Sequence, residues 1–145
     1  MKVWTLGAKV PDLDSEVAFL QKLGGAAVLD EVLTVDNRAI RVVLMQWGDK
    51  YLHLFSSAVY EARLGREISA GLCHVVFEAR DFDGQRQRAL QAGAREILPP
   101  QRIEAGFGIR DVSFLESPGG ILFELIRIHE NRVPNLNAGN ASEEK

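Results

Sequence analysis

The sequence predicts an α+β protein built from two similar halves, each with the order strand, helix and three strands. Two observations support this prediction. The segment Val10-Pro-Asp-Leu-Asp14 reappears as Ala79-Arg-Asp-Phe-Asp83, and each follows a strand-like run and opens a helix-like one. His53 and Glu124, in the last strand-like run of each half, are separated by nearly the same offset as the repeated segments. Loops readily absorb small differences in length of this kind.

The first half is expected to form a helix capped by Asp12 or Asp14. An apolar stripe at helical spacing includes Leu13, Val17 and Leu20, and the glycine pair 24–25 offers a stop. The runs that follow have strand-forming residues and turn signals at 36–37 and 47–49. We therefore expect an antiparallel meander over residues 26–35, 38–46 and 51–55.

The second half repeats this pattern of a helix-capping aspartate, a glycine stop and turn signals. A thinner apolar stripe predicts a helix over residues 83–92, which Gly93 ends. Strands are expected over residues 96–98, 109–115 and 121–128, with a turn at 117–120. The predicted organisation is a first module of residues 1–56, a linker of residues 57–71 with room for a short helix, a second module of residues 72–131 and a disordered polar tail of residues 132–145.

The composition narrows the range of partners and compartments. The 145 residues are 46% hydrophobic and 26% charged, which is enough apolar material for a substantial core. The net charge of −3 comes without a basic block, so nucleic acid and anionic membrane are not expected partners and a small molecule is favoured. One cysteine cannot form an internal disulfide, and no N-terminal stretch resembles a signal peptide or a spanning helix. These features predict a reducing cytoplasm.

The strongest candidate site combines two histidines and one glutamate from strand-like runs. The alternation of side chains along a strand gives His53 the same face as Tyr51 and Phe55, and His74 the same face as Glu78. Glu124 lies in an otherwise apolar run. Two imidazoles and one carboxylate suit a divalent transition metal and leave positions open for a substrate.

Each of these residues also has a simpler interpretation. His74 could be a half-buried strand histidine bonded to a neighbour, and His53 could form a hydrogen-bonded pair with Glu124. A buried carboxylate without a partner would be costly, so Glu124 requires a metal, a charged histidine or water. The coincidence of all three at repeat-equivalent positions favours the metal.

Several further side chains are candidates for substrate binding or catalysis. Lys9 shares parity with Thr5 and could hold a substrate carboxylate or phosphate, or could be a surface lysine. Glu78 could act as a catalytic base, or it could be one of the polar residues that are common at the rim of a cup-shaped site. Tyr51, Phe55 and Phe114 could line an aromatic pocket or could be core.

Three segments together resemble the vicinal oxygen chelate superfamily, which contains glyoxalase I, methylmalonyl-CoA epimerase, fosfomycin-resistance proteins and extradiol dioxygenases. They are residues 10–14, residues 74–83 and the run Ser117-Pro-Gly-Gly-Ile-Leu-Phe-Glu-Leu125. The resemblance covers nearly everything from Val3 to Ile128. It implies two βαβββ modules whose sheets curve together into a cup around a metal, and it implies a homodimer.

The resemblance also implies four equivalent ligand positions. His74 and Glu124 match the usual residue types, whereas His53 stands where relatives more often have Glu or Gln. Thr5 stands where they usually have His, and it is a poor ligand for a borderline metal. The implied site is therefore Fe, Mn, Ni or Zn held by His53, His74 and Glu124.

The predicted function is that of a metalloenzyme acting on a small substrate that chelates the metal through neighbouring oxygens. The reaction would be that of a glyoxalase-like lyase or isomerase or of a dioxygenase, with Glu124 and Glu78 as catalytic groups. The missing first-strand histidine supports an alternative, a metal-free protein that binds or sequesters a drug or other small molecule. A third possibility is a degenerate domain that serves only in assembly.

Overall fold

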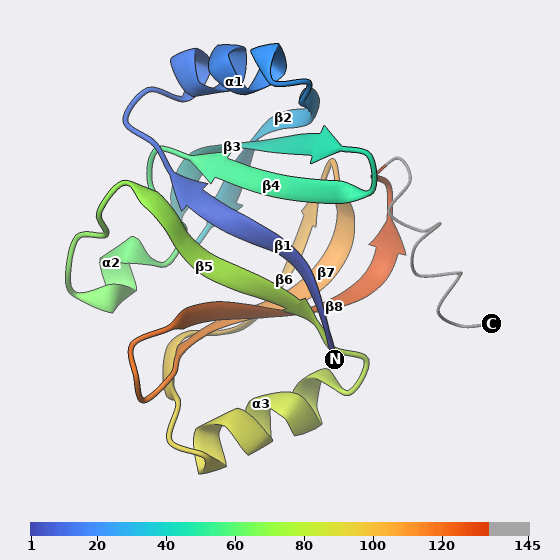
Figure 1. The fold of residues 1–145 in the computed structure, drawn as a ribbon. Helices are drawn as coiled ribbons and strands as arrows, with labels where there is room; N and C mark the ends of the chain where they lie inside the picture. The colour runs from blue at the N-terminus through green and yellow to red at the C-terminus, as the bar shows by residue number, and fades with distance from the viewer. Residues whose placement is uncertain (134–145) are drawn as a thin grey trace.

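The computed structural model describes residues 1–133, and residues 134–145 of the predicted tail lie outside the described part of the chain. One mixed sheet of eight strands has the order β2-β3-β4-β1-β5-β8-β7-β6 (Figure 1). Three helices complete the fold of residues 1–133. The elements in chain order are β1 Lys2–Lys9, α1 Leu13–Lys22, β2 Ala26–Val35, β3 Arg38–Trp47, β4 Lys50–Phe55, α2 Glu61–Leu64, β5 Gly71–Glu78, α3 Phe82–Gln91, β6 Arg95–Ala105, β7 Gly108–Glu116 and β8 Leu122–Asn131.

The sheet is composed of two equivalent modules. β2, β3 and β4 form an antiparallel meander in the first module, and β6, β7 and β8 form one in the second. The first strand of each module runs parallel to its last strand, so β1 pairs with β4 and β5 pairs with β8. An antiparallel ladder between β1 and β5 joins the modules at the centre of the sheet. The predicted α+β fold of two βαβββ modules is confirmed.

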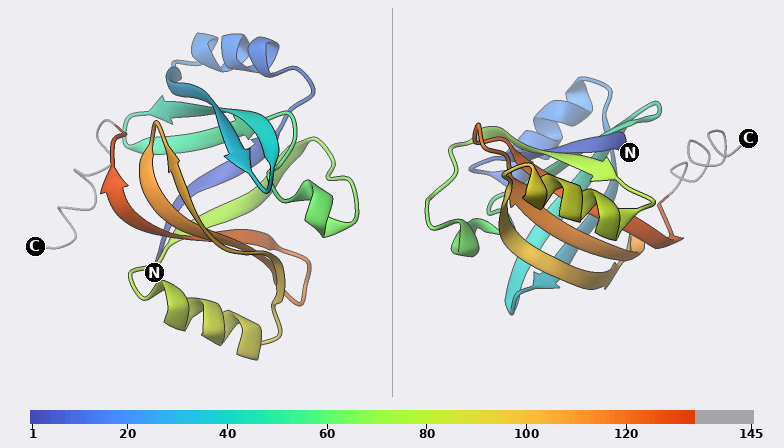
Figure 2. Two further views of the ribbon diagram at one scale, coloured as in Figure 1. Left: turned by 180° about the vertical axis from the view of Figure 1, so that it is seen from behind. Right: turned by 90° about the horizontal axis from the view of Figure 1, so that it is seen from below.

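Each long helix begins at an aspartate and packs on the outer face of its own module. The carboxylate of Asp12 accepts a hydrogen bond from the N–H of Ser15, and that of Asp81 accepts one from the N–H of Gly84, both at 3.1 Å. Figure 2 shows both helices on the outside of the curled sheet. Leu13 of α1 belongs to one buried cluster and Phe82 of α3 to another. Among residues 1–133, no helix is both long and apolar enough to span a membrane.

Strand β6 is much longer than the predicted strand over residues 96–98. It continues through Pro99 and Pro100 to Ala105, and its pairing with β7 is irregular between Leu98 and Gln101. A proline lacks the N–H that a central strand needs on both sides, but β6 lies at the edge of the sheet and has one neighbour. The prolines therefore mark an edge strand rather than its end.

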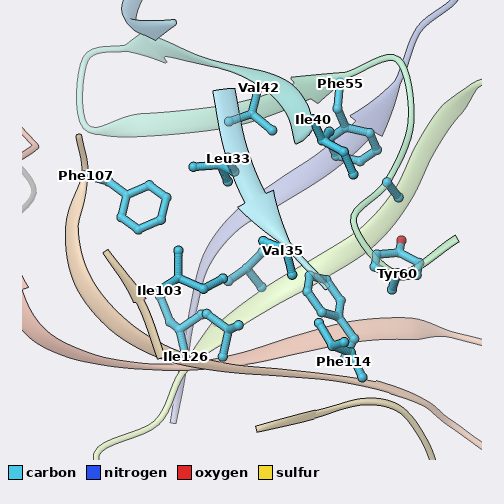
Figure 3. Close-up of a cluster of buried hydrophobic side chains, with 14 of the residues drawn as sticks. Leu33, Val35, Ile40, Val42, Phe55, Tyr60, Ile103, Phe107, Phe114 and Ile126 are labelled. Carbon is cyan, nitrogen blue, oxygen red and sulfur yellow. The ribbon is translucent and has the colours of Figure 1, made fainter. Parts of the chain in front are cut away.

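The sheet curls so that its two ends approach each other. β2 and β6 lie at opposite ends of the strand order, yet the N–H of Gly106, just after β6, donates to Oε2 of Glu31 on β2 at 2.7 Å. The inner face carries the largest buried cluster, with side chains from both modules. Figure 3 shows Leu33 and Val35 of β2 converging with Ile103 of β6 and Ile126 of β8. This curvature forms the cup in which the candidate site lies.

Candidate functional site

The inner face of the curled sheet encloses a cavity of about 580 Å³, its open mouth included. Most of its lining is apolar, and several of the contributing side chains can be followed in Figure 3. Four polar or charged side chains also line it, namely His53, His74, Arg110 and Glu124. A largely apolar pocket with a few convergent polar groups is the usual form of a small-molecule site.

The two histidines lie on either side of a glycine. Gly7 of β1 pairs with His53 of β4 on one side and with His74 of β5 on the other. The ring of His74 lies so close to Gly7 that a Cβ at this position would overlap ring atoms Cε1 and Nε2. The absence of a side chain at position 7 therefore gives the imidazole of His74 its place.

His74 is held by its neighbours in an apolar setting. The hydroxyl of Tyr60 lies 2.8 Å from Nδ1, and the ring stacks on Phe55 with a centroid separation of 5.6 Å. Only 8% of His74 is exposed, and this desolvation lowers its pKa to about 4, so the ring is neutral at pH 7. Nε2 makes no hydrogen bond to any residue within the described range, whereas Nδ1 is anchored.

His53 is neutral for a related reason. Its ring meets the Trp4 ring edge-on, with centroids 5.4 Å apart. Desolvation is the main cause that lowers the pKa of His53 to about 3, and electrostatic repulsion by Arg110 and His74 contributes to this value. Because a proton on His53 would be both desolvated and repelled, this side chain is a neutral donor or acceptor toward the cavity.

Glu124 is a carboxyl group in the apolar cavity. It pairs across the sheet with Val76 of β5 and Phe114 of β7. Burial raises the pKa of Glu124 to about 8, and the positive charge of Arg110 offsets this only in part. No hydrogen bond or ion pair joins its carboxyl oxygens to another described residue, so most of the group is protonated at pH 7.

Arg110 lines the cavity although, like Trp4, it was not among the site residues predicted from the sequence. Its side chain is 2% exposed, and its guanidinium lies 4.5 Å from the ring centre of Trp4 and 4.3 Å from that of Phe107. Desolvation lowers its pKa to about 10, which leaves the group charged at neutral pH. The sequence did contain a signal for its inward position. Arg110 has the same strand parity as Val112 and Phe114, which also line the cavity.

Three of the predicted substrate-binding residues lie outside the cavity lining. The hydroxyl of Thr5 donates to the carbonyl of Tyr51 at 2.7 Å, and both side chains are buried. Lys9 binds the carboxylate of Glu61 and the carbonyl of Ile68, each at 2.9 Å. Lys9 keeps the strand parity of Gly7, since it pairs with Phe55 of β4, but its ammonium group is occupied by these two contacts and is not part of the lining.

The other predicted residues divide between the cavity and its surroundings. Phe55 and Phe114 line the cavity, as does Trp4, which lies at a second register shift of β1. Glu78, predicted as a catalytic group, is not part of the lining, and its carboxylate lies 3.6 Å from Nζ of Lys2.

The three predicted metal ligands, His53, His74 and Glu124, share this cavity. Over residues 1–133, however, no three His, Cys, Asp or Glu side chains come together in a group that could hold a metal ion. The positive charge of Arg110 also opposes a cation at this place, as its effect on the pKa of His53 indicates. As placed, these side chains do not fit a divalent metal.

The chain was compared with known families and proteins. Residues 5–125 match the family model of the Glyoxalase/Bleomycin resistance protein/Dioxygenase superfamily, which confirms the predicted resemblance. The comparison with curated protein sequences finds no significant match.

Solved structures share the fold at low sequence identity. A Streptomyces coelicolor methylmalonyl-CoA epimerase variant in complex with 2-nitronate-propionyl-CoA is 23% identical, with 92% of this chain and 99% of that chain covered and a TM-score of 0.68. The Mycobacterium tuberculosis methylmalonyl-CoA epimerase is 22% identical, with coverages of 94% and 91% and a TM-score of 0.65. A Bacillus halodurans C-125 protein is 17% identical, with coverages of 90% and 96% and a TM-score of 0.67.

Proposed function

We propose, because this chain belongs to the Glyoxalase/Bleomycin resistance protein/Dioxygenase superfamily, that it is an enzyme of the lyase or isomerase type. Its reaction would move a proton on a small substrate that carries neighbouring oxygens. The observation that carries the proposal is Glu124, a carboxyl group without a hydrogen-bonding partner among the described residues, in an apolar cavity with a pKa raised to about 8. Isomerisation is also the reaction class named for the epimerases that share its fold.

A pKa near neutrality suits Glu124 to both halves of a proton transfer. Roughly a tenth of the group is ionised at pH 7 and can take a proton from a carbon beside a carbonyl. The protonated form then returns the proton to the same or a neighbouring atom. The cavity keeps the carboxyl group poorly hydrated, so its basicity once ionised exceeds that of an exposed glutamate.

His74 and Arg110 are suited to stabilise the enolate that such a step forms. In the tautomer in which the Tyr60 hydroxyl donates to Nδ1, the neutral ring of His74 carries its proton on Nε2, which makes no hydrogen bond to a described residue. A neutral imidazole donor and a buried guanidinium both stabilise negative charge that develops on a substrate oxygen.

Solvent exchange tests this proposal directly. The protein is incubated in deuterated water with hydroxyacetone, pyruvate or 2-oxobutyrate, and exchange of the C–H beside the carbonyl is followed by proton NMR. We expect exchange with at least one compound, a rate that rises from pH 6 to about pH 8 as Glu124 ionises, and a loss of 100-fold or more in Glu124→Gln. The matched control Glu104→Gln, on the surface of β6, should exchange at the wild-type rate. Wild-type exchange in Glu124→Gln, or none with any compound, would contradict the proposal.

A metal-dependent lyase, isomerase or dioxygenase activity is the second candidate. It has one specific observation in its favour, the bond between Tyr60 and Nδ1 of His74, which leaves Nε2 as the nitrogen for a ligand. If this candidate is right, anaerobic dialysis against Fe(II), Mn(II), Ni(II) or Zn(II) will load about one metal per chain and His74→Ala will lose it. Elemental analysis that finds no metal after all four ions would remove it.

A metal-free binding protein is supported by the apolar walls of the cavity. It differs from both enzyme proposals because it would retain small molecules unchanged. Ligand binding without solvent exchange and without metal uptake would establish this third candidate.

We also propose that two copies of the chain pair through the outer face of β1 and β5. Val3, Leu6 and Leu72 on these strands are exposed by 59%, 38% and 70%, an unusual concentration of large apolar side chains at the surface. Light scattering during gel filtration should give twice the chain mass of 16.1 kDa, and Leu72→Asp should shift the protein toward the single-chain mass. A single-chain mass for the wild type would remove the proposal.

The cytoplasm remains our proposal for the location of the protein. It rests on the single cysteine, Cys73, which suits a reducing compartment. Cell fractionation would test it.

A further inference from the structure

The guanidinium of Arg110 has donors that nothing in the described part of the chain accepts. Its Nε and Nη2 atoms are buried and make no hydrogen bond. An unsatisfied buried donor usually costs about 1–3 kcal/mol, and more when it is charged. The indole N–H of Trp4, which also lines the cavity, is likewise buried without an acceptor.

Nε and Nη2 form one edge of the guanidinium. Two other arginines of this chain bind carboxylates through this same edge. Arg41 donates from Nε and Nη2 to the two oxygens of Asp30 at 2.9 and 2.8 Å. Arg63 donates from the same two atoms to the oxygens of Asp36 at 2.6 and 2.8 Å. Such a two-point contact matches the planar carboxylate in geometry as well as in charge. The corresponding edge of Arg110 lacks its carboxylate.

The carboxylates nearest to Arg110 do not supply this contact. Glu124, Glu78 and Glu31 favour its charged form, but no carboxylate oxygen of the described residues comes within the 4.0 Å of an ion pair. Glu31 is held instead by the N–H of Gly106. Since Glu124 is mostly protonated at neutral pH, the cavity has a positive charge without a compensating partner in contact.

We propose that Arg110 binds the carboxylate of a small organic acid whose apolar portion occupies the cavity. This inference rests on the proposed function and names its substrate class. Arg110 lines the cavity, and the rings of Trp4 and Phe107 flank its guanidinium and restrict its plane. The remaining walls, including Leu33, Val42 and Ile103, contact the carbon chain of the acid.

A carboxylate fits this site better than a phosphate. One guanidinium edge satisfies the two oxygens of a carboxylate, whereas a doubly charged phosphate requires several further donors. The walls around Arg110 are mainly aliphatic and aromatic, and they favour an acid with a hydrocarbon portion. Neutral analogues of the acid lack the charge that the guanidinium requires.

Calorimetric titration with saturated acids isolates the binding step. Butanoate, hexanoate and octanoate are titrated into the full chain at pH 6, beside the matched amides and inorganic phosphate. We expect affinity to rise about three- to fourfold for each buried methylene, and the amides and phosphate to bind at least 30-fold more weakly than the acid. Arg110→Met should lose at least 30-fold in acid affinity, and Arg110→Lys about tenfold because it keeps the charge but not the fork.

Arg102→Met on the outer face is the matched control and should bind octanoate like the wild type. Circular dichroism establishes that each variant is folded. If Arg110→Met does not fold, Arg110→Lys still tests the two-point contact made by Nε and Nη2. Acid affinity within threefold of wild type in both Arg110 variants would overturn the inference, as would equal binding of the amides or tighter binding of phosphate.

Acid binding by Arg110 and proton transfer by Glu124 are tested with different compounds, so each can fail while the other holds. Octanoate has no ketone and cannot report proton transfer, whereas hydroxyacetone has no carboxylate and cannot report carboxylate binding by Arg110. Exchange of hydroxyacetone without Arg110-dependent acid binding would overturn the inference alone. Arg110-dependent acid binding without exchange of any ketone would overturn the proposed function alone.

Discussion

Arg110 and Asp111 are consecutive residues of β7, and they illustrate two ways of burying charge. Asp111 lies on the outer face and accepts hydrogen bonds from Arg102 at 3.1 Å and Arg127 at 2.7 Å, while Nε2 of His129 lies 2.7 Å away. Arg110 lies on the inner face and has no comparable partner among the described residues. One charge is satisfied by the fold, and the other remains to be satisfied by a ligand.

The carboxyl groups of the two faces show the same contrast. Burial alone would raise the pKa of Asp111, but its hydrogen bonds with His129, Arg127 and Arg102 hold it well below its usual range. Burial raises the pKa of Glu124 to about 8, and Arg110, which forms no ion pair with it, offsets this rise only in part. Partners within hydrogen-bonding distance therefore decide whether a buried charge stabilises the fold. Charges without such partners cost stability and are available for function.

The largest effect is expected when the outer network is broken. Asp111→Ala removes the shared acceptor of two arginines, and we expect the free energy of unfolding to fall by about 2–3 kcal/mol at pH 7. Because the folded pKa of Asp111 is depressed, the wild type has this stability above the unfolded pKa near 4 and loses it as the pH falls further. Urea denaturation at pH 7 and at pH 3 measures both effects.

Asp83→Ala is the matched control for the outer network, since Asp83 also meets Arg127 but its side chain is 77% exposed. It should change stability by less than about 0.5 kcal/mol. A cost for Asp111→Ala as small as that of Asp83→Ala would show that the outer network does not stabilise the fold.

A somewhat smaller effect of opposite pH dependence is expected at Glu124. Its folded pKa lies above the unfolded value, so the wild type loses stability as the pH rises from about 4.5 to about 8. Glu124→Gln removes this loss, and we expect the variant to gain about 2 kcal/mol over the wild type between pH 5.5 and pH 7. Thermal unfolding across this range provides the measurement, and a constant difference between the two proteins would contradict the raised pKa.

Replacing the charged side chain of Arg110 on the inner face should stabilise the fold slightly. Arg110→Met removes unsatisfied buried donors and keeps a flexible apolar chain between Trp4 and Phe107, so unfolding should cost about 1–2 kcal/mol more. Arg127→Met on the outer face is the matched comparison and should destabilise. If both variants lose stability equally, the inner and outer charges do not differ in the way described.

The smallest effect is expected at Tyr60. Tyr60→Phe deletes the hydroxyl that contacts Nδ1 of His74 and should cost about 1 kcal/mol of unfolding free energy. It should also change the tautomer of His74, which nitrogen NMR of the imidazole can follow. An unchanged tautomer would show that Tyr60 does not orient the ring.

Alternation along the strands was sufficient to predict much of the fold and part of the cavity. It placed His53, His74, Glu124, Phe55 and Phe114 on inward faces, and all five line the cavity. The aspartates at the start of each helix-like run likewise located both long helices. These features depend on local periodicity, which the sequence records directly.

The remaining features depend on contacts between distant segments. Trp4 lies where β1 shifts its register against β5, and no pattern within β1 reveals such a shift. Lys9 is held by Glu61 and Ile68, which belong to the connection between the modules. Tyr60 comes from the connection between modules and reaches His74 only after the sheet has curled. Arg110 had the inward parity, but its charge made a surface position the natural expectation.

The two prolines of β6 have a consequence for how copies of this protein meet. An edge strand with regular N–H groups can recruit a strand from another molecule and begin a fibre. Pro99 and Pro100 remove two of these groups from one end of the sheet, where the pairing with β7 is already irregular. This irregular, proline-containing edge is therefore a poor template for open-ended growth.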